Sequence, residues 1–161
     1  MRKIYIVKKI EGSKFVVPLL SARKIAEINT CDYADESFEQ VLSRYYMELR
    51  EIGLTEVKLA ELTGLTSSTI SFYLTGKRKP TLYSLTAVCI AMRLYYPRSL
   101  LLMKKANVSL DENSLKDRIC TKYLIGCGFD ESYNVDTCNL ELRKNFLSCL
   151  TPSALRQNDW C

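Results

Sequence analysis

Seven cysteines and no histidine limit the chemistry open to this 161-residue chain. None of the cysteines forms a Cys-x-x-Cys pair, so the usual zinc-binding spacings do not occur. The commonest general base is also missing. No phosphate-binding glycine loop or paired carboxylate motif is found either. We therefore predict that the protein is not an enzyme, and that it holds no cofactor and no metal.

The cysteines also bear on the compartment. Cys120, Cys127, Cys138 and Cys149 could form a four-thiolate site, but cysteines spaced so widely on helices are more often small core residues. A redox sensor is the other role left open for them. An odd cysteine count without a secretory signal favours a reducing compartment, and no apolar run approaches the ~20 residues of a membrane span. We expect a cytoplasmic protein without a membrane segment.

A second group of reactive side chains lies between residues 67 and 79. Three serine hydroxyls and one aromatic ring fall on the outer face of a predicted helix over 67–74, and a basic loop follows that helix. Hydroxyls can bond to base edges, a ring can contact a thymine methyl, and basic side chains contact phosphates. The members of this group are Ser67, Ser68, Ser71, Phe72, Lys77, Arg78 and Lys79.

Five helices are predicted over residues 36–106 to position these side chains. Apolar residues at spacings of three and four indicate helices over 36–52, 56–63, 67–74, from 82 onward, and from Pro97 to about Ala106. We predict Thr55, Thr66 and Thr81 as N-caps, and Gly64 as a left-handed C-terminal residue. Residues predicted to be buried in the second and third helices are Val57, Leu59, Ala60, Leu62 and Ile70.

The flanking segments complete a mainly α fold. β-branched and aromatic residues at 4–9 and 15–17 around a turn predict an N-terminal β-hairpin, followed by a short helix over 22–28. Ser114 with Asp117 resembles a capping box, and Asn134 caps another helix. The apolar stripes of these two C-terminal helices are Leu115, Ile119, Tyr123, Val135, Cys138, Leu142 and Phe146. We thus divide the chain into a hairpin segment (1–35), a helical core (36–106) and a helical extension (107–161), with a short final turn from Thr151.

Two short helices joined by a tight glycine turn are what a helix-turn-helix needs. The first packs across the second, and the second presents its N-terminal residues to the major groove. Residues 54–71 (LTEVKLAELTGLTSSTIS) and the exit at 76–82 (GKRKPTL) resemble the phage repressor and Cro (XRE) family. Residues 101–110 and 116–119 are similar to the C-terminal extension of small Firmicute regulators, with Asn107 where those proteins usually have glycine.

This resemblance implies a five-helix, lambda-repressor-like bundle and a transcriptional regulator, most often a repressor, that binds double-stranded DNA as a homodimer. Base contacts come from the helix over 67–74, and phosphate contacts from neighbouring threonines and the basic loop. The implied DNA-binding residues are Thr55, Thr66, Ser67, Ser68, Ser71, Phe72, Thr75, Lys77, Arg78 and Lys79.

Two features favour a different reading of the same fold. The net charge of +5 does not arise in residues 36–80, where six acidic and six basic side chains cancel. Glu56 stands where many family members have a Gln that contacts phosphate, and it would repel phosphate unless Lys58 or a neighbour offsets its charge. Ser67 stands where they have Gln or Arg, and the face lacks the bidentate Arg or Asn contacts that discriminate bases. The alternative is a protein-interaction module, such as an antitoxin or adaptor subunit. The lysines of the hairpin are either solubilising edge charges or a wing against DNA.

Overall fold

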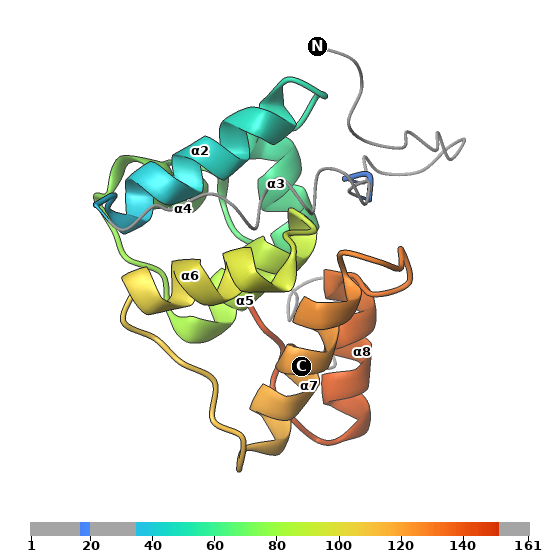
Figure 1. The fold of residues 1–161 in the computed structure, drawn as a ribbon. Coiled ribbons are helices and arrows are strands. Elements are labelled where there is room, and N and C mark those ends of the chain that lie inside the picture. The colour runs from blue at the N-terminus through green and yellow to red at the C-terminus, as the bar shows by residue number, and fades with distance from the viewer. Residues whose placement is uncertain (1–16, 20–34, 152–161) are drawn as a thin grey trace.

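The structure, a computed structural model, describes residues 17–19 and 35–151. Within these residues it is mainly helical, with seven helices and no strand (Figure 1). The helices are α2 (Phe38–Arg50), α3 (Glu56–Thr63), α4 (Ser67–Thr75), α5 (Leu82–Ala91), α6 (Tyr96–Lys105), α7 (Leu115–Gly126) and α8 (Val135–Lys144). All five helices predicted over 36–106 are present, as are the two predicted in the extension.

Helix α5 forms the centre of the molecule. Every residue from Ser84 to Ala91 is buried, because α3, α6, α7 and α8 all pack against this helix. The C-terminal pair α7 and α8 lies beside α5 and α6, while α2, α3 and α4 form the other side (Figure 1). One continuous cluster of buried apolar side chains therefore runs from the helix-turn-helix into the extension.

The predicted caps account for the helix boundaries. Thr55, Thr66 and Thr81 each accept a hydrogen bond from the backbone N–H three residues on, which satisfies a donor that the first helical turn leaves open. Asn134 does the same for α8 and forms a full capping box. The first helix begins later than expected, at Phe38 instead of 36, because the Ser37 hydroxyl accepts from Gln40 N and defines the start.

Four apolar predictions are wrong in detail. Val57 is 58% exposed. In the last turn of α3 the buried residue is Thr63, whose hydroxyl donates to the carbonyl of Leu59 in the same helix. Leu62 is only partly buried. Leu115 is exposed, and Phe146 lies beyond the end of α8 with a positive φ and a side chain that is 98% exposed.

The predicted capping box of α7 is only half formed. Ser114 accepts from the N–H of Asp117, as expected. The Asp117 carboxylate does not bond back to Ser114. It accepts instead from the hydroxyl of Tyr83 at 2.8 Å and from the N–H of Asp111 at 2.8 Å. A tertiary partner has replaced the local one, and Asp117 joins α7 to α5.

Further long-range contacts connect the extension to the core. Arg93, just after α5, is 3% exposed and donates to four backbone carbonyls of the segment between α7 and α8: those of Cys127, Asp130, Glu131 and Tyr133. After α8, Thr151 donates to the carbonyl of Thr63 at 2.8 Å. The extension therefore contacts the last residue of α3 directly.

Several predictions fall outside the described residues. These are the β-hairpin over 4–9 and 15–17, apart from Val17, together with the short helix over 22–28 and the part of the final turn after Thr151. Val17 itself is buried and is not in a strand. Among the described helices, none combines the length and the apolar composition that crossing a bilayer requires.

Candidate nucleic-acid interface

The turn between α3 and α4 sets the orientation of the candidate site. Gly64 ends α3 with φ +75°, in the left-handed region, and its N–H bonds to the carbonyl of Ala60. Ala60 is buried, and α3 and α4 pack together. Thr66 then caps α4, and Ile70 is buried at 1% exposure on the inner face. These contacts direct the inner face of α4 to the core and leave the opposite face free.

The N-terminal half of α4 carries the predicted base-contacting side chains on its surface. Ser67 and Ser68 are exposed, Ser71 is partly exposed, and the Phe72 ring is 38% exposed. Tyr73, next to Phe72, is buried instead. One side of the helix is therefore committed to packing and the other presents three hydroxyls and one ring to solvent.

The basic loop lies at the other end of α4. Lys77, Arg78 and Lys79 are all exposed, and none forms an ion pair with a described residue. The Lys77 ammonium lies 5.9 Å from the centre of the Phe72 ring, and the N–H of Arg78 bonds to the carbonyl of Phe72. The loop and the outer face of α4 therefore form one surface.

The three candidate threonines are engaged within the fold. The Thr55 and Thr66 hydroxyls each accept from a backbone N–H as helix caps, and Thr75 donates its hydroxyl proton to the carbonyl of Ser71 at 2.9 Å. All three side chains are exposed. The caps hold their oxygens at the rim of the surface, where a hydroxyl proton or a neighbouring N–H could meet a phosphate.

Internal ion pairs neutralise part of the acidic charge nearby. Arg98, buried at 4%, donates to both carboxylate oxygens of Glu48 at 2.9 and 3.1 Å. Glu36 forms an ion pair with Arg44. Arg98 lies outside residues 36–80, so its pair with Glu48 removes one acid from the count, whereas the Glu36–Arg44 pair removes one acid and one base. The remaining charges of the segment have a small basic surplus, to which the loop contributes three cations.

Glu56 lies in the first turn of α3. Burial, and after it the charge of Glu56, raise the pKa of Tyr46. Lys58, which we considered as compensation for Glu56, donates its ammonium to the carbonyl of Gly53 at 3.0 Å. The Glu56 carboxylate belongs to the first turn of α3, at the positive end of the helix, where a negative charge is favourable.

Sequence reasoning missed one neighbour of the surface. Gly76 ends α4 with φ +79°, and a Cβ at this position would lie 2.9 Å from Cδ of Glu39 in α2. Ser43, one turn further along α2, donates to the carbonyl of Leu74 at 3.0 Å. Helix α2 thus supports the end of α4 from which the basic loop begins. No sequence signal pairs these residues, because their separation of about thirty positions is decided by packing.

The described cysteines do not form a metal site. No group of three or more potential metal ligands occurs among the described residues. Cys89, Cys120, Cys127 and Cys138 are free and buried, as predicted for packed thiols. Burial raises the pKa of both Cys89 and Cys127 to about 12, which leaves them as unreactive thiols at neutral pH. Cys149 differs from the prediction, because it is disulfide-bonded.

The fold and the exposed face of α4 define a helix-turn-helix of the DNA-binding regulator class. Comparison with protein families agrees: residues 44–95 match the helix-turn-helix family model. Over this segment the chain is therefore similar to the helix-turn-helix family, in agreement with the resemblance to repressor and Cro (XRE) proteins that the sequence predicted. Neither the curated proteins nor the solved structures include a significant match to the chain.

Proposed function

We propose that the protein is a cytoplasmic transcriptional repressor that binds an operator as a homodimer and inserts α4 into the major groove. One observation carries the proposal. The N-terminal part of α4 is exposed, and it is followed by a basic loop whose three cations form no ion pair with a described carboxylate. A helix-turn-helix needs this arrangement, with base-contacting side chains at the helix start and cations near the backbone.

The chemistry of each side chain suggests which part of the DNA it would contact. Ser67, Ser68 and Ser71 would bond to base edges, and Phe72 would contact a thymine methyl. Lys77, Arg78 and Lys79 would contact phosphates. Serine accepts almost any base, so discrimination by α4 alone is weak, and DNA shape would supply part of the specificity. Two-fold pairing on half-sites about one helical turn apart would supply the remaining affinity.

Replacing Lys77, Arg78 and Lys79 together by Ala tests the phosphate contacts. We expect weaker binding to every duplex and a log–log salt slope reduced by up to about three, because each lost phosphate contact removes roughly one unit. Fluorescence anisotropy with random-sequence duplex DNA between low and moderate salt measures both effects. Lys104→Ala, an exposed lysine on α6, serves as the charge control. An unchanged slope in the triple variant would exclude phosphate contacts by this loop.

Selection from a random DNA library tests sequence reading and the dimer together. A palindromic consensus is the expected result, and Ser67→Ala or Ser71→Ala should change the preferred bases while leaving the salt slope unchanged. The second candidate function, a protein-interaction module, rests on the partly buried carboxylate residue Glu56 at the start of α3 and on the weakly discriminating face of α4. A protein that does not bind any duplex even at low salt would belong to that class.

A further inference from the structure

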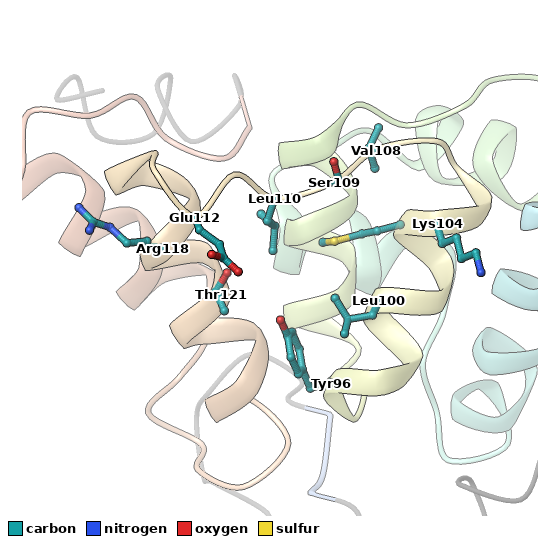
Figure 2. A pocket seen from close by; sticks show the side chains of 10 residues that line it. Tyr96, Leu100, Lys104, Val108, Ser109, Leu110, Glu112, Arg118 and Thr121 are labelled. Carbon is teal, nitrogen blue, oxygen red and sulfur yellow. The ribbon is translucent and has the colours of Figure 1, made fainter.

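A cavity of about 550 Å³ lies away from the DNA-facing surface, between α6, α7 and the segment that joins them (Figure 2). Its volume falls within the range of small-molecule sites. Tyr96, Leu100 and Met103 line it from one face of α6, since they are spaced by four and three residues, and Val108 and Leu110 line it from the connecting segment. The wall is therefore mainly apolar.

At this cavity the acidic side chain points inward, and the two basic side chains point away from it (Figure 2). In Figure 2 the carboxylate of Glu112 points into the space between the two helices, as does the Thr121 side chain. The guanidinium of Arg118 and the ammonium of Lys104 point away from that space, although both residues lie at its edge. The charge presented to an occupant is therefore negative. The Tyr96 ring, which also lines the cavity, adds an aromatic wall of the type that attracts cations.

We propose that this cavity binds an amphipathic organic cation, with its ammonium beside Glu112 and Thr121 and its apolar part against Leu100, Met103 and Leu110. The apolar lining excludes a strongly polar ligand, because such a ligand would lose its hydration without compensating bonds. The carboxylate disfavours an organic anion. A compact ammonium with an alkyl chain or a ring matches both the carboxylate and the apolar lining. This site is separate from the helix-turn-helix surface, and the inference does not depend on DNA binding.

The proposal is tested on the full-length protein without DNA, by isothermal titration calorimetry with octylammonium as the probe. Octanol and octanoate, which have the same chain, are the matched ligands. We expect saturable 1:1 binding of octylammonium, with octanol weaker by about tenfold and octanoate weaker still, since a charge-assisted bond contributes roughly one order of magnitude at a partly exposed site. Equal binding of octanol and octylammonium, or binding of none of the three, would overturn the proposal.

Two variants assign the binding to this cavity. Glu112→Gln keeps the shape and removes the charge, so octylammonium should weaken to the level of octanol. Leu100→Arg places a cation at the mouth and should abolish octylammonium binding; Leu100 is 43% exposed, so the fold tolerates the change. Asp136→Asn, an exposed carboxylate on α8 outside this cavity, is the matched control and should leave binding unchanged. Weakening by Asp136→Asn equal to that by Glu112→Gln would show that the probe responds only to net charge, against the proposal.

Discussion

Phe72 and Lys77 show how the candidate site depends on single side chains. A phenylalanine ring at the surface, 5.9 Å from an ammonium, is worth little to folding stability in water. On the surface that also carries the exposed hydroxyls of Ser67 and Ser68, this pair places an apolar ring next to a positive charge. A groove of DNA presents methyl groups and phosphates in the same proximity.

Gly76 is required by both its backbone and its neighbour. Gly76→Ala places a Cβ at φ +79° and against Glu39, so we expect a loss of about 1–2 kcal/mol in the free energy of unfolding. Urea denaturation measures it. Gly128→Ala is the control, because a Cβ there would meet only ordinary contacts at 3.9 Å. If both variants lost the same stability, the left-handed geometry at Gly76 would not be the cause.

Tyr83 makes the free energy of unfolding depend on pH in the alkaline range. Burial, and after it the hydrogen bond to Asp117, raise the pKa of Tyr83 from 10.0 to about 12. The unfolded chain therefore releases this proton first, and Tyr83 contributes a loss of stability as pH rises from about 10 to about 12. In Tyr83→Phe this contribution disappears, so the free energy of unfolding should fall less steeply over that window.

Urea titrations at several pH values give that slope. The variant is also expected to be less stable at neutral pH, because Asp117 loses one of its donors. Tyr95→Phe, which removes a half-buried hydroxyl elsewhere, is the control and should keep the slope of the parent protein. Identical slopes in all three proteins would mean that Tyr83 does not titrate as its surroundings suggest.

At the scale of elements, Arg93 organises the connection between α7 and α8. Its guanidinium is buried without a carboxylate partner among the described side chains, and four carbonyl dipoles take that place. Burial lowers the pKa of Arg93, and the neighbouring Cys127, Glu131 and Asp130 oppose this shift. Arginine nevertheless remains charged at any ordinary pH. Arg93 thus adds four bonds to a segment whose own backbone bonds include those from Phe129 and Asp130 to the carbonyl of Gly126.

Arg93→Met should therefore destabilise the protein by about 2–4 kcal/mol, because the carbonyls lose a charged donor while remaining partly buried. Arg93→Lys should recover only part of this, since a single ammonium cannot reach the carbonyls that two guanidinium nitrogens contact. Thermal unfolding monitored by circular dichroism measures both. Equal stability of Arg93→Lys and the parent protein would contradict a requirement for the guanidinium geometry.

At the scale of the whole molecule, the extension completes the core. Helix α5 is buried on all sides, and α7 and α8 cover part of it. Thr151 adds a hydrogen bond to the last residue of α3. The boundary that we predicted at residue 106 thus separates two segments that share one apolar cluster.

A fragment of residues 1–106 is therefore expected not to unfold cooperatively. The faces of α5 and α6 that α7 and α8 bury would be exposed to water, and their transfer out of water is the main source of stability. Circular dichroism and gel filtration of the fragment, with the full chain as reference, provide the test. A monomeric fragment with a sharp thermal transition would show that the core folds independently.

The sequence by itself determined where α3, α4 and α5 begin and where α3 ends. These boundaries depend on interactions between residues no more than four apart, namely the caps of Thr55, Thr66 and Thr81 and the left-handed Gly64, and such interactions can be read directly from spacing. The helix-turn-helix, and with it the set of candidate DNA contacts, followed from these local signals.

Only the tertiary structure decided where the remaining side chains go. Asp117 bonds to Tyr83 across 34 positions, and Thr151 to Thr63 across 88. Val57 belongs to the predicted apolar stripe but has no element packed over it. The cavity beside Glu112 is lined jointly by residues of α6, of α7 and of the segment that joins them (Figure 2). Contacts of this kind depend on the three-dimensional packing of elements, for which residue spacing carries no signal.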